Sequence, residues 1–186
     1  MKLAMALVLA LVGACGSVPG DTVEEKRAHI DAWEQQTLGM LFEQHPQAEA
    51  SLEQAPGYLA VSQRVVKVPI FGGGGGYGVL VDRTRDRRLY VKLDRMDMGG
   101  GLGARNLRVV VVIHDPKLLK EDAGAHWSFG GGAEASAKAG ESGAAGGVGG
   151  GGKGQEGFTL YELTEEGVSV TWTLYAIRIS ALSDLN

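Results

Sequence analysis

The sequence predicts an α+β fold in which N-terminal helices pack on a strongly bent, mostly antiparallel, glycine-rich β-sheet shaped like half of a barrel. Helical periodicity is confined to the first third of the chain, and segments with the length and polarity pattern of strands follow from Tyr58 onward. Glycine makes up 30 of the 186 residues, about twice its ordinary share of ~7%. Glycines within strands mark bends and close backbone contacts, which is why we expect strong curvature.

The predicted helical segment covers residues 22–57. Thr22 and Glu25 have the spacing of a capping box, which predicts that a helix begins at Val23. Apolar residues then recur at helical spacing at positions 30, 33, 40 and 41, so we expect this helix to continue to about Phe42. Pro46 disfavours the helical conformation in the residue before it. A second, short helix is therefore expected from Pro46 to about residue 54.

Strands are predicted where the chain becomes valine-rich, alternates in polarity or is continuously apolar. These segments are Arg64–Phe71, Tyr77–Asp82, Arg88–Leu93, Leu107–His114 and Trp127–Ala139. A closing hairpin is expected from Phe158–Leu163 and Val168–Ile179, joined by a turn at Glu165–Gly167. Leu107–His114 is apolar almost throughout, so we expect burial on both of its faces. The Asp115–Pro116 pair predicts a short helix through about Glu121.

Gly140–Gly157 is the most biased segment, with ten glycines in eighteen residues. Such a composition suits either a flexible loop or glycine-rich strands. We expect a loop in its middle with ordered residues on either side.

Composition limits the classes of function. The 18 basic and 22 acidic residues give a net charge of −4, without the basic surplus typical of nucleic-acid-binding proteins. The single cysteine, Cys15, excludes an intramolecular disulfide and any multi-cysteine zinc or iron–sulfur site. We therefore expect no nucleic-acid partner and no cysteine-bound metal.

Residues 1–14 have the pattern of a bacterial lipoprotein signal peptide. Lys2 provides a positive start, and Leu3–Val12 is an apolar run of ten residues. This run is shorter than the about 20 residues of a transmembrane helix and suits a secretory leader. Small residues lead directly to Cys15, as in the lipobox, where the cysteine is acylated and the chain is cut before it. An ordinary signal peptide with an incidental cysteine is the alternative.

Lipidation of Cys15 implies a place in the cell envelope. Several acyl chains, at ~0.8 kcal/mol per buried CH₂, anchor a protein stably to a membrane. Residues 15–21 then form a lipidated tether. Gly16 stands where an aspartate would favour retention in the inner membrane. In a Gram-negative source we therefore expect the outer membrane, with the domain facing the periplasm.

Two segments that look like nucleotide-binding motifs fail on their context. Gly73–Gly78 satisfies G-x-G-x-x-G, but the dinucleotide motif opens a helix, whereas a strand is predicted to follow here. Gly147–Lys153 fits most of a phosphate-binding loop, yet Gly154 stands where a magnesium-binding Ser or Thr is required. We therefore expect no nucleotide and no other cofactor.

The polar residues show no catalytic arrangement. The histidines at positions 29, 45, 114 and 126 include no pair four residues apart and no H-E-x-x-H motif. Asp94 and Asp97 have the spacing of ordinary solvated residues. We therefore predict a non-enzymatic protein. An enzyme with an unrecognised site would instead require a deep polar pocket that contains His114, His126 or Asp94.

One dense basic cluster lies in a charged turn between two predicted strands. Its members are Arg83, Arg85, Arg87 and Arg88. Basic side chains near an anionic bilayer contribute about 1 kcal/mol each, so these arginines and Lys67 are candidates for binding lipid headgroups. Exposed backbone N–H groups in the glycine-rich segments are further candidates for receiving phosphate. The alternative is a solvated turn whose charges discourage edge pairing.

Four motifs, in order and spacing, resemble the SYLF domain. They comprise Tyr58–Val61 with Val66–Val79, Gly99–Gly103 with Val109–Ile113, Trp127–Gly140, and Thr159–Gly167. The resemblance covers residues 58–186, which is most of the chain that follows the leader.

The resemblance implies a role at lipid membranes. Bacterial SYLF proteins are typically secreted or lipid-anchored and described as lipid-binding, and eukaryotic members bind phosphoinositides and in some cases actin. We therefore expect a non-enzymatic envelope lipoprotein whose domain contacts membrane lipid headgroups, with anionic phospholipid as the candidate partner. The alternative is a structural or interaction protein of the envelope that binds protein or glycan and is only anchored by lipid.

Overall fold

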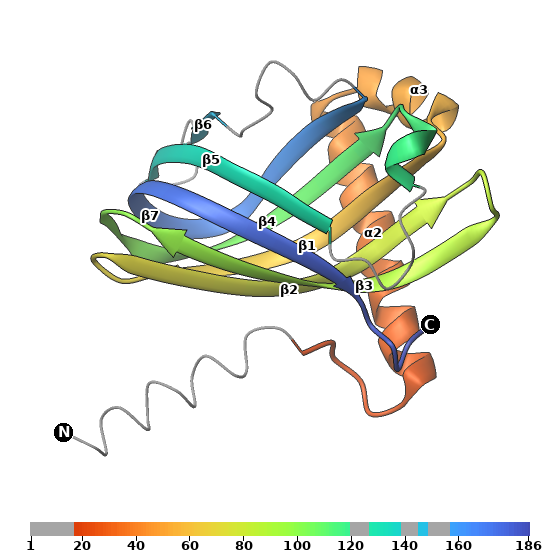
Figure 1. Ribbon diagram of the computed structural model, residues 1–186, viewed down its shortest axis with the longest axis horizontal. Coiled ribbons are helices and arrows are strands. Elements are labelled where there is room, and N and C mark those ends of the chain that lie inside the picture. Colours follow the sequence, from red (N-terminus) through yellow and green to blue (C-terminus); the bar gives the residue numbers. More distant parts are fainter. Residues whose placement is uncertain (1–16, 120–126, 139–144, 149–156) are drawn as a thin grey trace.

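The computed structural model describes residues 17–119, 127–138, 145–148 and 157–186, with the backbone alone for residues 127–138, 145–148 and 164–177 (Figure 1). The described elements are α2 (Val23–Gln44), α3 (Gln47–Gln54), β1 (Gly57–Lys67), β2 (Phe71–Asp82), β3 (Arg87–Met98), β4 (Gly101–Ile113), the 3₁₀ turn η1 (Pro116–Leu119), β5 (Trp127–Lys138), β6 (Ala145–Val148) and β7 (Phe158–Ala181). The strands form one antiparallel sheet in the order β3-β2-β1-β4-β7-β5-β6, with a further pairing of β3 with β7. The predicted α+β class is confirmed.

Local sequence signals set the limits of the helices. Thr22 Oγ1 accepts a hydrogen bond of 3.1 Å from the Glu25 amide, and the Glu25 carboxylate accepts one from the Thr22 amide, so the predicted capping box is confirmed. α2 ends at Gln44, slightly beyond the predicted end, and α3 follows Pro46 as expected. Among the helices that the structure describes, none has the length and apolar character needed to span a bilayer.

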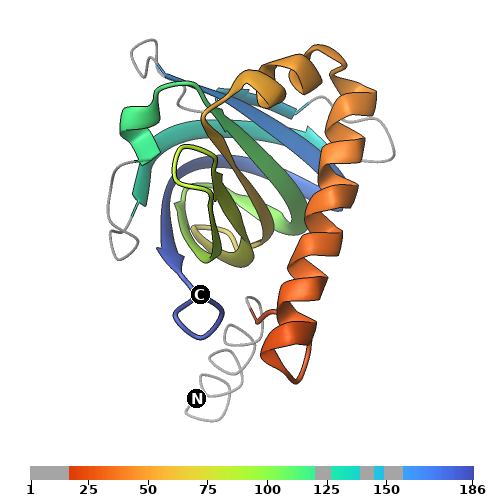
Figure 2. The same ribbon diagram turned by 90° about the vertical axis from the view of Figure 1, so that its right-hand side faces the viewer.

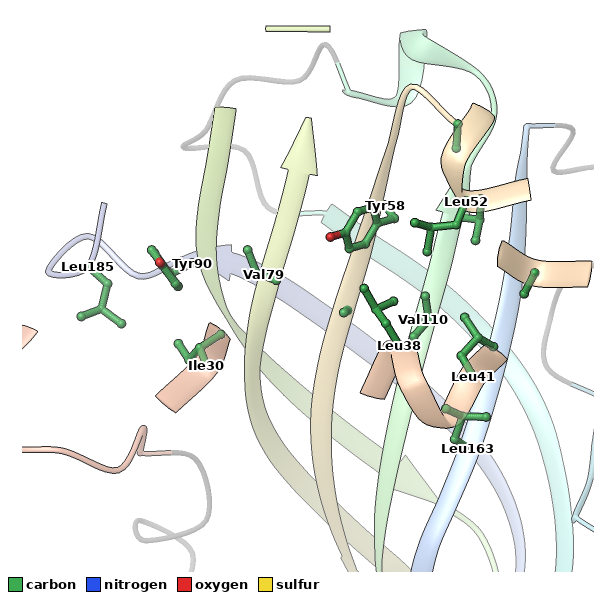
Figure 3. Close-up of a cluster of buried hydrophobic side chains, with 14 residues drawn as sticks. Ile30, Leu38, Leu41, Leu52, Tyr58, Val79, Tyr90, Val110, Leu163 and Leu185 are labelled. Carbon is green, nitrogen blue, oxygen red and sulfur yellow. The ribbon is translucent and has the colours of Figure 1, made fainter. Parts of the chain in front are cut away.

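The sheet buries apolar side chains on both of its faces. On the outer face, α2 and α3 cover a core that contains Ile30, Leu38, Leu41, Leu52, Tyr58, Val110 and Leu163 (Figure 3). On the inner face, a second core contains Leu59, Leu80, Val91, Val111, Leu119 and Ile179. Seen from the end, α2 lies along one side of the curved strands (Figure 2). The prediction that Leu107–His114 is buried on both faces is confirmed for most of that run, whereas His114 itself is exposed.

β7 is one continuous strand, so the predicted closing hairpin is wrong. Its register passes from Leu107↔Thr164 to Asn106↔Glu166, which leaves Glu165 as the extra residue of a β-bulge. The polar signal at Glu165–Gly167 therefore marks a bulge rather than a turn.

β7 also turns back on itself. Its first part pairs with β4 as far as Thr171, and its last part pairs with β3 from Leu174. β3 and β4 run in opposite directions on the two sides of the β1–β2 hairpin. A single strand that is antiparallel to both must reverse between them, as Figure 1 shows.

The glycine run of β2 is part of the sheet rather than a binding loop. Gly72–Gly75 pair with β1 on one edge and with β3 on the other. Their N–H groups belong to these two ladders, so the expectation that this run offers them to phosphate is wrong. A Cβ atom on Gly76 would lie 1.7 Å from the Ser62 carbonyl oxygen, and one on Gly78 would lie 2.0 Å from that of Ala60. Only glycine permits such a close approach of two strands.

The remaining structural predictions have mixed outcomes. Of the helix expected after Asp115, residues 116–119 form the 3₁₀ turn η1, and residues 120 and 121 lie outside the described residues. Within Gly140–Gly157, where a central loop was expected, residues 145–148 form β6 and pair with β5, while residues 140–144 and 149–156 lie outside the described residues. The predicted signal peptide and Cys15 lie outside them as well.

Candidate functional site

The predicted arginine cluster lies at the turn that joins β2 to β3, and Asp82 organises this turn. The fully buried Asp82 carboxylate accepts hydrogen bonds from the Thr84 amide (3.1 Å) and hydroxyl (2.6 Å), and it contacts Arg85 at 3.4 Å and Arg87 at 3.5 Å. Burial by itself raises the pKa of Asp82, but these hydrogen bonds and charges outweigh it, and the pKa is lowered.

Arg83 joins the turn to the end of α3. Its guanidinium donates to the carbonyl oxygens of Leu52, Glu53 (3.4 Å) and Ala55 (3.0 Å). It also lies 5.5 Å from the centre of the Tyr58 ring. The last carbonyl groups of a helix have no partner within the helix, so Arg83 caps α3 from the sheet.

Arg88 joins β3 to α2 through two carboxylates. Its guanidinium donates to Asp31 at 2.6 Å and to Glu34, and Glu34 also accepts a hydrogen bond of 2.7 Å from the Tyr58 hydroxyl. Burial opposes the charge on Arg88, yet the hydrogen bonds to Glu34 and Asp31 outweigh burial and raise its pKa. Burial, together with the charged Glu34, also raises the pKa of Tyr58.

The structure therefore gives each arginine of the cluster partners inside the protein. Arg85, besides contacting Asp82, donates to the Leu119 carbonyl oxygen at 2.7 Å. Lys67, the fifth headgroup candidate, lies at the opposite end of β1, on the inner face, with only 3% of its surface exposed. The four arginines hold helices and turns to the sheet, and Lys67 shares no surface with them. A headgroup role for these five residues stays a prediction.

The inner face of the sheet changes from apolar to polar toward the end where Lys67 lies. The buried polar side chains there are Gln63, Lys67, Arg95, Asp97 and Arg105. Arg95 Nε donates to Asp97 Oδ1 at 2.7 Å, and both side chains are almost fully buried. Gly72 packs closely against this pair, since a Cβ atom on it would lie 3.1 Å from the Asp97 Cβ atom, which is tighter than an ordinary contact.

On the outer face, the same end of the sheet exposes a group of large apolar side chains, which we call the apolar end. Its members are Val66, Val68, Ile70, Phe71, Met96, Met98 and Leu102, each between 40% and 75% exposed. They account for seven of the ten exposed large apolar side chains in the described part of the chain. A contiguous apolar group of this kind is a candidate contact surface.

Strand register explains why these side chains gather. Phe71 lies opposite Met98, and Val66 lies in the same cross-strand row as Gly73 and Met96. The two turns at this end are also joined, because the Gly99 amide donates to the Ile70 carbonyl oxygen at 2.9 Å. The residues come from two hairpin ends that are distant in sequence but adjacent in the sheet.

A charged row lies directly behind the apolar end on the same outer face, and we call it the polar row. It runs across five strands as Asn106, Arg64, Gly75, Asp94 and Arg178. Apart from Gly75, all members of this row are exposed. Asp94 is joined by Lys92, two residues further along β3, with Nζ 3.6 Å from Oδ2.

Sequence reasoning missed both groups. A usable signal exists in β3, where the exposed alternate positions change from Lys92 and Asp94 to Met96 and Met98. A solvent-facing strand side that turns apolar at its end points to a contact surface. Placing it beside Val66 and Phe71 requires the register of β1, β2 and β3, which the sequence alone does not give.

The residues considered for catalysis do not come together. His114 Nε2 lies 2.9 Å from Thr159 Oγ1 at the exposed end of β4, whereas Asp94 lies in the polar row. His126 is outside the described residues. Within the described ranges, no three His, Cys, Asp or Glu side chains are placed to hold a metal ion.

These features define an α+β protein whose bent antiparallel sheet carries helices on one half of its outer face and exposed apolar side chains on the other. No protein-family model matches the chain. The chain is similar to Beta cell expansion factor A of Aeromonas veronii, with 22% identity over 147 residues. The match covers 79% of this chain and 54% of that protein, so the chain spans about half the length of this relative.

Proposed function

We propose that the protein is a non-enzymatic lipoprotein of the cell envelope whose SYLF-like domain contacts membrane lipid. Cys15 carries the acyl anchor, and in a Gram-negative source the domain faces the periplasm from the outer membrane. The single observation that carries the lipid contact is the apolar end, where seven large apolar side chains are exposed together.

The bent sheet is, in this proposal, the half-barrel of the SYLF domain. Two observations support it: β3 pairs with β7 as well as with β2, and the glycines of β2 allow β1 and β2 to approach closely on the inner side of the bend. The curvature matters for function because it brings both hairpin ends to one side of the domain.

The apolar end has the size expected for a reversible lipid contact. Complete burial of a large apolar side chain contributes about 1.5–3 kcal/mol. The seven residues are on average about 60% exposed, so burying their exposed parts would contribute roughly 6–12 kcal/mol. Association costs ~4–15 kcal/mol in lost freedom. The domain therefore binds lipid reversibly on its own, and acyl chains on Cys15 make its attachment stable.

We assign the contact to the apolar end and not to the arginine turn, because the guanidinium groups of Arg83 and Arg88 are engaged with α3 and α2. An anionic headgroup would have to compete with the buried carboxylate of Glu34 and with the carbonyl groups that Arg83 caps. Breaking such internal contacts destabilises the fold.

The test uses residues 16–186, which contain every described element but lack the lipidated cysteine. Co-sedimentation with phosphatidylcholine and phosphatidylglycerol vesicles measures binding by the domain alone. Phe71→Ser and Met98→Ser should each reduce the bound fraction several-fold. Leu160→Ser is the matched control, since it removes an exposed leucine (43%) outside the apolar end, and it should bind like the parent domain.

Two outcomes decide against the proposal. If the folded domain binds no vesicle, Cys15 is its only membrane contact, and the apolar end serves a protein or glycan partner instead. If Leu160→Ser weakens binding as much as Phe71→Ser, the apolar end is not the contact surface. Circular dichroism on each variant confirms that it is folded.

A further inference from the structure

We infer that the apolar end enters one leaflet of the bilayer with the strand ends foremost, as far as the polar row, and that the cations of this row select anionic phospholipid. This inference rests on the proposed lipid contact and adds its depth, its orientation and its preferred lipid.

The boundary between apolar and charged side chains is sharp and runs across the sheet. On β1 the outer face changes from Val66 to Arg64, and on β3 it changes from Met96 to Asp94. Each change takes two residues, or about 7 Å along a strand. Val66 and Met96 lie in one cross-strand row, and Arg64 and Asp94 lie in the next. Both changes therefore fall between the same two rows, and the boundary is a line across the sheet.

The depth of the apolar end fits one leaflet. The outermost strand residues, Phe71 and Met98, lie four residues beyond the polar row. This distance is about 13 Å along the strands. Half of the ~30 Å hydrocarbon core is about 15 Å. The domain can therefore immerse its apolar rows without crossing the membrane, while the polar row stays at the level of the headgroups.

The backbone at this end is suited to an apolar environment. An unpaired N–H or C=O group in hydrocarbon costs several kcal/mol. At the turn between β1 and β2, the Val68 amide donates to the Phe71 carbonyl oxygen at 2.9 Å, and the Gly99 amide of the neighbouring turn donates to Ile70. The amides of Val68 and Gly99 and the carbonyl groups of Phe71 and Ile70 in these exposed turns are therefore paired within the protein.

The charge at this end is opposite in sign to that of the whole protein. Register places thirteen charged residues from the Lys92 level to the hairpin ends: the basic residues are Arg64, Lys67, Lys92, Arg95, Arg105, Arg108, Lys138 and Arg178, and the acidic ones are Asp94, Asp97, Glu134, Glu165 and Glu166. Eight positive and five negative charges give +3, in a chain whose total is −4. The rest of the chain therefore carries −7. Such a separation of charge orients the protein toward an anionic surface.

The exposed members of this group are placed to meet headgroups. Arg64 and Arg178 lie on either side of Asp94 in the polar row, and Lys92 lies one row behind. Lys67 and Arg95 are buried on the inner face and do not reach lipid, and the charge of Arg95 is paired with that of Asp97. Each basic residue near the surface contributes about 1 kcal/mol, which corresponds to about fivefold in affinity.

Single-cysteine labelling tests the depth, because residues 16–186 contain no other cysteine. An environment-sensitive fluorophore is attached to Ile70→Cys at the apolar end, to Asn106→Cys in the polar row, and to Glu53→Cys on α3 as the control. Quenchers are placed either on the acyl chains or on the headgroups of phosphatidylcholine–phosphatidylglycerol vesicles. Acyl-chain quenchers should act on the label at 70, headgroup quenchers on that at 106, and neither on that at 53.

Charge selection is tested on the same vesicles. Arg64→Gln and Arg178→Gln should each weaken binding to phosphatidylglycerol-containing vesicles about fivefold and leave the weaker binding to phosphatidylcholine unchanged. Lys117→Gln, which removes an exposed cation outside this end, should have no effect. Added salt should weaken binding of the parent domain and affect the two arginine variants less.

The failures of the two proposals are distinguishable. Equal, salt-insensitive binding to both vesicle types overturns charge selection but leaves the lipid contact standing. Binding without acyl-chain quenching at residue 70 overturns insertion, and quenching at residue 53 instead assigns the contact to another face. Absence of binding to every vesicle overturns both proposals and favours a protein or glycan partner.

Discussion

The Tyr58 hydroxyl donates a hydrogen bond of 2.7 Å to the fully buried Glu34 carboxylate and thereby joins β1 to α2. Arg88 on β3 donates to the same carboxylate. A buried charge is tolerated only when it is paired and hydrogen-bonded. This three-residue contact therefore fixes the position of α2 on the outer face, and α2 in turn leaves the apolar end uncovered.

Removal of this hydrogen bond should destabilise the fold. Tyr58→Phe leaves Glu34 with Arg88 but removes one donor, and a hydrogen bond to a charged group contributes about 1.5–3 kcal/mol. Urea unfolding at neutral pH should show a loss of that size. An unchanged unfolding free energy would show that the Tyr58 hydroxyl does not stabilise the contact.

The same residue predicts a loss of stability in alkaline solution. The pKa of Tyr58 is raised above its ordinary value of 10.0 in the folded protein, so the folded state keeps its proton where the unfolded state loses it. The contribution of Tyr58 to the free energy of unfolding is therefore fully present below pH 10 and should be lost as the pH rises beyond it. Urea unfolding of the parent and of Tyr58→Phe across this range checks the effect, since the variant should show a smaller decline.

Asp82 predicts the opposite dependence in acid. Its pKa lies below the ordinary value of 3.8, so its contribution is present above pH 3.8 and is lost as the pH falls further. Asp82→Asn should lower stability at neutral pH and flatten the acid branch of the unfolding curve. A variant with the same acid dependence as the parent would assign that dependence to other carboxylates.

Arg83 separates a structural role of the arginine turn from a headgroup role. Arg83→Gln removes the cap from α3, and a lost hydrogen bond from a charged group costs roughly 1.5–3 kcal/mol. Thermal unfolding should show the loss, whereas binding of the folded variant to anionic vesicles should match that of the parent. Weaker vesicle binding by a fully folded Arg83→Gln would restore this turn as a lipid-contact site.

The glycines of β2 should differ in tolerance according to the face they occupy. A Cβ atom on Gly76 would lie 1.7 Å from the backbone oxygen of Ser62, whereas one on Gly73 would lie 3.5 Å from its nearest neighbour, the Arg95 carbonyl oxygen. Gly76→Ala should lower soluble yield or destabilise by about 3 kcal/mol or more. Gly73→Ala should be neutral or stabilise by about 0.4–1 kcal/mol. Thermal unfolding of Gly73→Ala tests the argument even if Gly76→Ala does not fold.

Features that depend on neighbours in sequence could be predicted. The capping box at Thr22, the end of α2 before Pro46 and the apolar run of β4 follow from local preferences, and the structure has all three. The Glu165–Gly167 signal was local too, but whether it becomes a turn or a bulge depends on the partner strand β4. A turn would have ended β7 where β4 instead offers a continuous ladder.

The candidate site could not be predicted because it depends on contacts between distant segments. The arginine turn was visible as a basic cluster, yet its partners Asp31 and Glu34 lie on α2, more than fifty residues earlier. The apolar end arises from the register of four strands. The sequence correctly places Lys67 on a strand. The face on which its side chain lies depends on the strand register, which is set only when the sheet packs.

The path of β7 has a consequence for how the chain folds. The hairpins β1–β2 and β2–β3 join neighbouring segments, but Val91 pairs with Ala181, ninety positions later. Proteins dominated by such distant pairings fold slowly, in milliseconds to seconds. The edges of β3 and β4 stay open until the last strand docks, and during that interval the chain is prone to pair with other chains.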